Sequence, residues 1–322
     1  MLADSFGRRF YYLRLSVTEV CNFSCTYCLP NGYSGPKPSA FMRRDELRRV
    51  MQVFAAEGTR KIRLTGGEPS LRADLPDIIA DARQTQGIET VALTTNGYRL
   101  AESIADWQRE GLSQLNVSID SLDPAQFKAI TGHDRLRAIL QGVDASLAIG
   151  VPVKINAVYM RGVNDQLGQF LAWLKTTPVT LRFIEVMEVG AQPDFYHNHH
   201  VPLSNMKQQL LLEGWQPIVR GKDAGPAQEF WHPDYAGRIG LIMPYSRDFC
   251  TTCNRLRVTA QGKLHLCLFG ETGYDLRPWL QEDAQQEELA AMIQEALGHK
   301  PATHGLHEHN TGLIRDLSMI GG

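Results

Sequence analysis

The chain has 322 residues, enough for one large domain or two smaller ones with cores of their own. Hydrophobic residues make up 43% and charged residues 21%, an ordinary globular composition that excludes wholesale disorder. Lys plus Arg (33) nearly balance Asp plus Glu (35), and this net charge of −2 argues against nucleic acid or a membrane surface as a partner.

Apolar or β-branched runs recur along the first 190 residues and predict six strands. They lie at residues 11–17, 61–65, 90–94, 114–119, 153–159 and 180–186. Between some of them, apolar residues at i, i+3, i+4 and i+7 predict helices near residues 47–54, 136–147 and 167–174. Because alternating strands and helices form right-handed βα units, we predict an α/β fold with a partial (βα)6 TIM-like barrel over residues 1–190.

Beyond residue 190 the alternation stops. The segment GAQPDFYHNHHVP is typical of a loop, and helices are expected near residues 203–212 and 285–297. A strand is indicated at residues 263–267, after the Gln261-Gly262 turn. We therefore predict a separate C-terminal α+β extension over residues 191–322.

Gly, Asn and polar residues follow three of the barrel strands, at residues 66–69, 94–97 and 118–123. In parallel α/β folds, the carboxyl ends of the strands carry the chemistry. We therefore expect the active site at this edge of the sheet.

The six cysteines form two triplets, which are the strongest functional signal in the sequence. They are Cys21, Cys25 and Cys28, spaced C-x3-C-x2-C, and Cys250, Cys253 and Cys267, spaced C-x2-C-x13-C. Disulfide frameworks belong to small secreted chains, and the first residues, MLADSFGRRFYYLRLS, lack the features of a signal peptide. We therefore expect a cytoplasmic protein whose cysteines bind metal.

The short first loop lets three thiolates face one inorganic centre. A structural zinc site has four closed ligands, whereas a [4Fe–4S] cluster on three cysteines keeps one iron open. We predict such a cluster at the first triplet, with a zinc knuckle completed by a distant ligand as the alternative. At the second triplet, His265 could complete a Cys3His zinc site, but a second cluster with an open iron is the more economical interpretation.

Basic residues recur on the predicted barrel strands, where a buried cation is costly unless it meets an anion. Lys61, Arg63 and Thr65 share one face of the second strand, because side chains alternate along a strand. Further basic residues on other strands are Arg14, Lys154 and Arg182. Any one of them could be a solvated rim charge or the partner of a carboxylate, but their number favours an anion site.

These motifs resemble the radical S-adenosylmethionine (SAM) enzymes. The first triplet follows a strand, Tyr27 precedes its third cysteine, and Gly66-Gly67-Glu68-Pro69 follows the second strand. The second triplet with Asn254-Arg255-Leu256-Arg257, and the terminal Gly321-Gly322, narrow the resemblance to the GTP 3′,8-cyclases, the family that begins molybdenum cofactor biosynthesis. The likeness covers about residues 8–322, and we find no motif position that departs from the family pattern.

The resemblance implies two [4Fe–4S] clusters and SAM as cofactors. The first cluster would bind SAM and donate the electron that yields a 5′-deoxyadenosyl radical. In the family this radical takes the C3′ hydrogen of GTP, and attack of C3′ on C8 gives 3′,8-cyclo-7,8-dihydro-GTP. The second cluster would hold the guanine of GTP.

The resemblance also assigns residues to each ligand. The SAM pocket would contain Tyr27, Gly67, Glu68, Ser118 and Met187. GTP, with about four negative charges, would be bound by Arg14, Lys61, Arg63, Thr94, Lys154, Arg182, Arg255 and Arg257. The catalytic candidates are Cys21, Cys25, Cys28, Arg255, Arg257, Gly321 and Gly322. Plain structural roles stay open for Gly67 as a turn, Ser118 as a cap and Met187 as core.

The family further implies an electron donor such as flavodoxin, a homodimer, and cyclic pyranopterin monophosphate synthase as the enzyme that receives the product. One alternative is another radical SAM enzyme with an auxiliary cluster, of the peptide or sulfatase maturase type, although those usually carry more C-terminal cysteines. Another is a non-enzymatic iron–sulfur or zinc protein, which has no need of inward-facing cations in a barrel.

Overall fold

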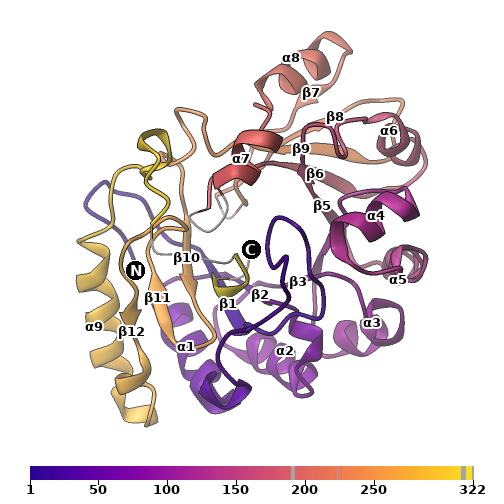
Figure 1. Ribbon diagram of the computed structural model, residues 1–322. Coiled ribbons are helices and arrows are strands. Elements are labelled where there is room, and N and C mark those ends of the chain that lie inside the picture. The colour runs from indigo at the N-terminus through magenta and orange to yellow at the C-terminus, as the bar shows by residue number, and fades with distance from the viewer. Residues whose placement is uncertain (190–192, 223, 313–316, 321–322) are drawn as a thin grey trace.

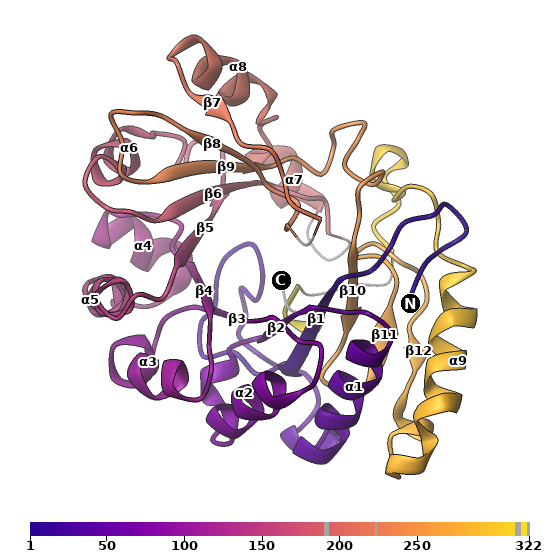
Figure 2. The same ribbon diagram turned by 180° about the vertical axis from the view of Figure 1, so that it is seen from behind.

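A computed structural model describes residues 1–189, 193–222, 224–312 and 317–320 of the chain. Within these residues a single twelve-stranded sheet curves around a central space, with helices on its outer side (Figures 1 and 2). The strands are β1 (Tyr12–Thr18), β2 (Lys61–Gly66), β3 (Thr90–Thr95), β4 (Gln114–Ser118), β5 (Val153–Tyr159), β6 (Thr180–Glu185), β7 (Gln216–Pro217), β8 (Gln228–Trp231), β9 (Arg238–Ile242), β10 (Arg255–Val258), β11 (Lys263–His265) and β12 (Tyr274–Asp275).

Strands β1 to β6 pair in chain order and in parallel, which confirms the partial six-stranded barrel. The C-terminal strands then lengthen this sheet at both edges. Strand β10 joins β1 in parallel and continues antiparallel into β11 and β12, while β9 joins β6 in parallel and continues antiparallel into β8 and β7. The C-terminal residues therefore flank the barrel on two sides.

Most of the helices lie on the outer side of the sheet (Figures 1 and 2). The helices are α1 (Arg44–Ala56), α2 (Leu75–Gln84), α3 (Leu100–Arg109), α4 (Pro124–Thr131), α5 (Leu136–Ala148), α6 (Gly168–Leu174), α7 (Pro193–His199), α8 (Ser204–Leu212) and α9 (Gln286–Leu297). The short 3-10 turns are η1 (Pro38–Ala40), η2 (Pro69–Leu71), η3 (Arg277–Trp279), η4 (Asp283–Gln285), η5 (Leu306–Glu308) and η6 (Leu317–Ile320). Among the helices that the structure describes, none has the length and apolar character needed to cross a bilayer.

The predicted helices α1, α5, α6, α8 and α9 are confirmed, but the loop expected after residue 190 is wrong, because it contains α7. Pro193 occupies the first helical position, where a fixed φ and a missing N–H do no harm. The rings of Phe195 and His199, four residues apart, contact each other in a tilted arrangement, with 4.6 Å between their centroids, and support the helix.

Strand β2 illustrates why the interior of the barrel is polar. Ile62 and Leu64 point outward and belong to the hydrophobic core between the sheet and the helices. Lys61, Arg63 and Thr65 alternate with them and point to the opposite face, yet they are also buried. The apolar core therefore lies outside the barrel, and the charged side chains lie within it.

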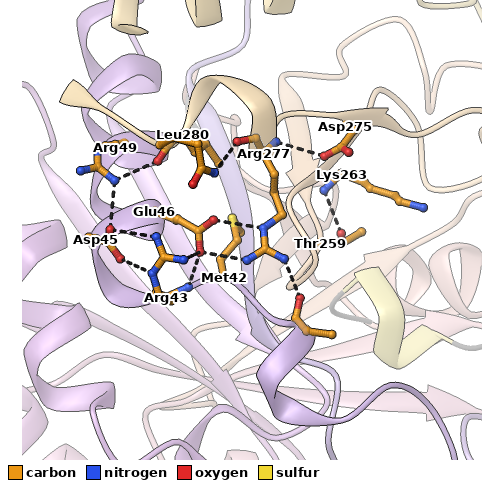
Figure 3. Close-up of polar contacts among 12 residues, drawn as sticks. Met42, Arg43, Asp45, Glu46, Arg49, Thr259, Lys263, Asp275, Arg277 and Leu280 are labelled. Carbon is orange, nitrogen blue, oxygen red and sulfur yellow. Dashed lines mark hydrogen bonds and ion pairs between the residues drawn. The ribbon is translucent and has the colours of Figure 1, made fainter. Parts of the chain in front are cut away.

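An ion pair between the buried Glu46 and the half-buried Arg277 ties α1 to the C-terminal residues (Figure 3). Glu46 is fully buried and accepts hydrogen bonds from Arg277 Nε at 3.0 Å, from Arg277 Nη2 at 3.1 Å and from the backbone N–H of Arg43 at 2.8 Å. Arg49 adds a hydrogen bond to the carbonyl of Leu280 at 2.8 Å. Because Arg277 follows β12, these contacts fix the β10–β12 side of the sheet against the barrel.

Candidate active site

The first cysteine triplet lies on the loop that follows β1 and rests on the end of α4. Backbone N–H groups of Ser24 and Thr26 donate to carbonyls of Thr131 and Ile130 at 3.2 and 3.0 Å. A further bond from the N–H of Cys28 to the carbonyl of Cys25, at 3.0 Å, closes the turn between two of the cysteines. All three thiols are half-buried and line one cavity at the carboxyl ends of the strands.

Gly66 and Gly67 bring β2 close to this loop. A Cβ at Gly66, whose φ is +151°, would lie 2.1 Å from the carbonyl oxygen of Thr18. At Gly67 it would lie 2.4 Å from the carbonyl oxygens of Glu19 and Val20. The close approach that these glycines permit is therefore to the chain itself, directly before Cys21, and Gly67 also lines the cavity.

Glu68 is fully buried and is engaged by its own neighbours. Its carboxylate accepts hydrogen bonds from the Thr95 hydroxyl at 2.7 Å and from the backbone N–H groups of Asn96 at 2.6 Å and Ser70 at 2.9 Å. Asn96 in turn lies beside the first cysteine, with Nδ2 3.9 Å from the Sγ of Cys21. Glu68 thus shapes the cavity wall through these residues.

Tyr27, Ser118 and Met187 line the cavity of the first triplet. The Tyr27 hydroxyl donates to Asp120 Oδ2 at 2.9 Å, and the second oxygen of Asp120 accepts from the N–H of Val158 at 2.8 Å. Burial raises the pKa of Asp120 to about 6 despite these bonds. Asp120 holds the tyrosine, although sequence reasoning did not single it out.

The thiols of the first triplet lie in apolar, acid-flanked surroundings. Burial raises the pKa of Cys21 to about 11, and the nearby carboxylate of Glu68 adds to the rise. The pKa of Cys25 is raised well above its usual value by burial and by Asp120. In the metal-free chain these sulfurs therefore favour the protonated form.

The second triplet lines a cavity that adjoins that of the first. Cys250, Cys253 and Cys267 are free thiols that line a second cavity together with Arg14, Arg255 and Arg257. Ile184 and Met187 line both this cavity and that of the first triplet. Met187, expected in the SAM pocket, therefore lies where the two sites adjoin.

Cations surround the second triplet. Arg255 lies in contact with Cys253, with Nη2 4.0 Å from its Sγ. Although burial raises the pKa of Cys253, Arg255 and then Lys300 lower it, and the net shift is downward. Arg257 points to the same side of β10 and donates to the carbonyl of Ile320 at 3.4 Å, which brings η6 to the site. Gly321 and Gly322 lie outside the described residues.

The strand register places the predicted cations in rows across the barrel interior. Arg14 on β1 is aligned with Arg257 on β10 and with Arg63 on β2. The neighbouring register level aligns Tyr12 with Arg255 and Lys61. Residues that are far apart in the chain therefore form one continuous basic surface.

A third cavity lies beside these rows and is lined by Lys61, Arg63, Lys154 and Arg182. Burial, and then repulsion by Arg63, lowers the pKa of Arg182 to about 9. The buried Nε atoms of Arg63 and Arg182 have no hydrogen-bond partner among the described residues. Orphaned buried donors on mutually repelling cations indicate a site for a polyanion.

Two charged residues of this third cavity were missed by sequence reasoning. Arg220 lines it from the segment between β7 and β8 and is 3.4 Å from the hydroxyl of Thr252, beside the second triplet. Glu229 on β8 pairs with Lys154 at 2.6 Å. Neither residue lies in a local sequence motif. Both are brought to the barrel by the pairing of β8 with β9, which the sequence does not show. Thr94, expected among the cations, instead lines the cavity of the first triplet.

The donor set fits iron–sulfur clusters, since three thiols line each of the two cavities. In the part of the chain that the structure describes, no three His, Cys, Asp or Glu side chains converge on one metal-ion position. His265, the candidate fourth zinc ligand, pairs with Arg257 across β10 and β11, and burial lowers its pKa to about 4.

Two solved structures of similar fold were determined with S-adenosylmethionine (AdoMet) bound. SuiB of Streptococcus suis, solved bound to S-adenosylmethionine, has a TM-score of 0.65 at 12% identity, over 89% of this chain and 68% of SuiB. The protein anSMEcpe, solved with AdoMet and a peptide, has a TM-score of 0.55 at 16% identity, over 88% of this chain and 83% of its own. At these identities the likeness concerns the fold alone.

Sequence families and relatives define the chain further. The family described as the Radical SAM superfamily matches residues 15–174, and that described as Molybdenum Cofactor Synthesis C matches residues 179–306. GTP 3′,8-cyclases of Yersinia pestis and Klebsiella pneumoniae are each 56% identical over 100% of this chain and 99% of their own. The chain therefore belongs to the GTP 3′,8-cyclase family of radical SAM enzymes.

Proposed function

We propose that this chain converts GTP into 3′,8-cyclo-7,8-dihydro-GTP, with SAM as the radical source, as the first step of molybdenum cofactor biosynthesis. The observation that carries the proposal is a barrel interior in which two cysteine triplets adjoin one continuous basic surface. A redox site and a polyanion site in one enclosed space suit a nucleoside triphosphate that undergoes radical chemistry. The name of the relatives, GTP 3′,8-cyclase, supports this substrate.

Each triplet would hold one [4Fe–4S] cluster, the cofactor that this family uses together with SAM. When bound, these groups supply the radical chemistry, in which reductive cleavage of SAM leads to removal of the C3′ hydrogen of GTP. The chain itself positions SAM with Tyr27, Ser118, Met187 and the backbone at Gly67. We assign Glu68 a supporting role, because Thr95, Asn96 and Ser70 occupy its carboxylate.

The triphosphate would lie along the basic surface and satisfy the orphaned guanidinium donors there. Its ligands would be Arg14, Lys61, Arg63, Lys154 and Arg182, with Arg220 as an added contact. Arg255 and Arg257, beside the second triplet, would contact the nucleotide near its base. Thr94, which lies with the first triplet, would then face the ribose side of GTP.

The C-terminal residues would complete the wall of the active site. Leu317 and Ser318 line the first cavity, and the carbonyl of Ile320 accepts from Arg257. We propose that Gly321 and Gly322 continue from there into the active site. Their small size and lack of side-chain volume suit a place close to both ligands.

We also propose the biological setting. The two family matches meet between residues 174 and 179, close to a boundary at 190 between the barrel and a C-terminal extension over 191–322. Metal-binding cysteines suit the reducing cytoplasm. There the chain would act as a homodimer, receive electrons from a donor such as flavodoxin and pass its product to cyclic pyranopterin monophosphate synthase.

The test uses the anaerobically reconstituted protein with SAM, a reductant and GTP deuterated at C3′. We expect 5′-deoxyadenosine and a cyclised dihydro-GTP in comparable amounts, with deuterium transferred to the 5′-deoxyadenosine. ATP serves as the control nucleotide and should give no cyclised product. If 5′-deoxyadenosine forms without deuterium and GTP is unaltered, the radical SAM assignment stands and the GTP assignment fails.

A further inference from the structure

Lys300 is a buried lysine next to the second triplet. It follows α9, is 4% exposed, and its ammonium donates to the carbonyl oxygen of Leu266, the residue before Cys267. The same ammonium lies 5.5 Å from the ring centroid of Phe10. None of the ion pairs formed by the described residues includes Lys300.

A buried ammonium without a carboxylate is costly to keep. A carbonyl and an aromatic face stabilise it in part, but neither supplies a negative charge. The nearby groups able to do so are the thiolates of the second triplet. Lys300 is among the groups that lower the pKa of both Cys253 and Cys267, although burial leaves the pKa of Cys267 raised overall.

A second cation at the triplet makes a useful contrast. Arg8 donates to the carbonyl of Cys250 at 3.2 Å, but its charge is balanced by Asp4, with Arg8 Nε 2.5 Å from a carboxylate oxygen. Lys300 therefore supplies a charge that the surrounding protein leaves unbalanced. At the first triplet the neighbouring charges are negative instead: Glu68 raises the pKa of Cys21, and Asp120 raises that of Cys25.

We infer that Lys300 is a positioning residue of the second cluster: it fixes the backbone before Cys267 and holds an unbalanced positive charge that raises the cluster's reduction potential. A positive charge favours the reduced cluster because that state carries one more negative charge. Residues that contact metal ligands in this way both orient the ligands and change the reduction potential of the metal. The inference rests on the proposed function, which places a [4Fe–4S] cluster at this triplet.

Three variants separate the roles of the side chain. Lys300→Met removes both the charge and the hydrogen bond, Lys300→Gln keeps a donor for the carbonyl of Leu266 without the charge, and Lys300→Arg keeps both. Lys175→Met is the matched control, because Lys175 also faces an aromatic ring, that of Tyr235 at 5.9 Å, but is exposed and lines neither triplet's cavity.

The measurements are iron per chain after anaerobic reconstitution and the potential of each cluster in a redox titration followed by electron paramagnetic resonance. For Lys300→Gln we expect both clusters to load, with the reduction equilibrium of the second cluster lowered about tenfold, or about 59 mV for one electron. Lys300→Met should shift that potential equally and lose iron from the second site. The first cluster, Lys300→Arg and Lys175→Met should match the wild type.

Unchanged potentials in both Lys300→Gln and Lys300→Met would overturn the inference. Equal shifts at both clusters, or a Lys300→Arg variant as impaired as Lys300→Met, would also overturn it, since either points to general loosening of the fold. A wild-type chain that binds iron only at the first triplet would instead contradict the proposed function. The two failures are therefore distinguishable before any variant is compared.

Discussion

The two cysteine triplets offer the same three sulfur ligands in opposite electrostatic surroundings. At the first, burial and the carboxylates of Asp120 and Glu68 disfavour negative charge on the sulfurs. At the second, Arg255 and Lys300 favour it and outweigh burial at Cys253. An acid-flanked cluster is harder to reduce and so a stronger reductant, which suits SAM cleavage, whereas a cationic site suits an anionic nucleotide. The surroundings, rather than the ligands, distinguish the two sites.

The largest effects should come from the cysteines themselves. Cys25→Ala should abolish SAM cleavage, because the first cluster loses a ligand. Cys253→Ala should spare uncoupled SAM cleavage and lose the cyclised product. Both are measured as 5′-deoxyadenosine and cyclised dihydro-GTP by mass spectrometry. Equal SAM cleavage in the two variants would remove the functional difference between the sites.

Arg277→Met tests how the second site is held against the barrel. It removes the two hydrogen bonds from Arg277 to the buried carboxylate of Glu46 and leaves that of the Arg43 backbone N–H, so we expect a loss of about 2 kcal/mol in the free energy of unfolding. Iron should be lost from the second triplet before the first, because Arg277 also packs against Gly262 in the β10–β11 turn. Denaturant unfolding and iron counts measure both effects. Arg109→Met, which breaks an exposed ion pair with Asp106, is the control and should change stability by less than about 1 kcal/mol.

Arg63→Ala tests whether the basic surface of the barrel interior binds the phosphates of GTP. Loss of a buried guanidinium should weaken binding of GTP roughly 100-fold and leave guanosine binding nearly unchanged. Calorimetry with the two ligands measures the difference. Arg60→Ala is the matched control, since Arg60 directly precedes β2 but is exposed and paired with Glu89. If GTP and guanosine weaken alike, Arg63 has a structural role instead.

Asp120→Asn tests the surroundings of the first triplet through the pH dependence of the free energy of unfolding. The pKa of Asp120 in the fold, about 6, lies above the usual carboxyl value of 3.8, so the fold favours the protonated form. Its contribution to stability is fully present below about pH 4 and lost as the pH rises through 6. Asp120→Asn should therefore gain on the order of 2 kcal/mol relative to wild type between pH 4 and pH 8.

Unfolding of the metal-free chain at both pH values measures this difference. The exposed Asp144→Asn is the control and should show no such gain. A gain of the same size in both variants would mean that the effect does not arise from the buried carboxyl.

Much of the fold and of the site could be predicted because the signals are local. Apolar and β-branched runs predicted the six barrel strands, and the alternation of side chains along a strand placed Lys61 and Arg63 on one face. Cysteine spacing predicted both triplets. Each of these patterns is set by the geometry of a few consecutive residues, whose side chains alternate along a strand or cluster on a turn.

The remaining features depend on contacts between distant residues. Nothing in the local pattern shows that β9 and β10 join opposite edges of the barrel sheet, because strand pairing is decided by the whole fold. That pairing brings Arg220 and Glu229 to the cation cavity. The sequence alone thus determined the six barrel strands and the two cysteine triplets, whereas the tertiary structure decided the charges around each triplet, since burial and neighbouring charges exist only once the chain is packed.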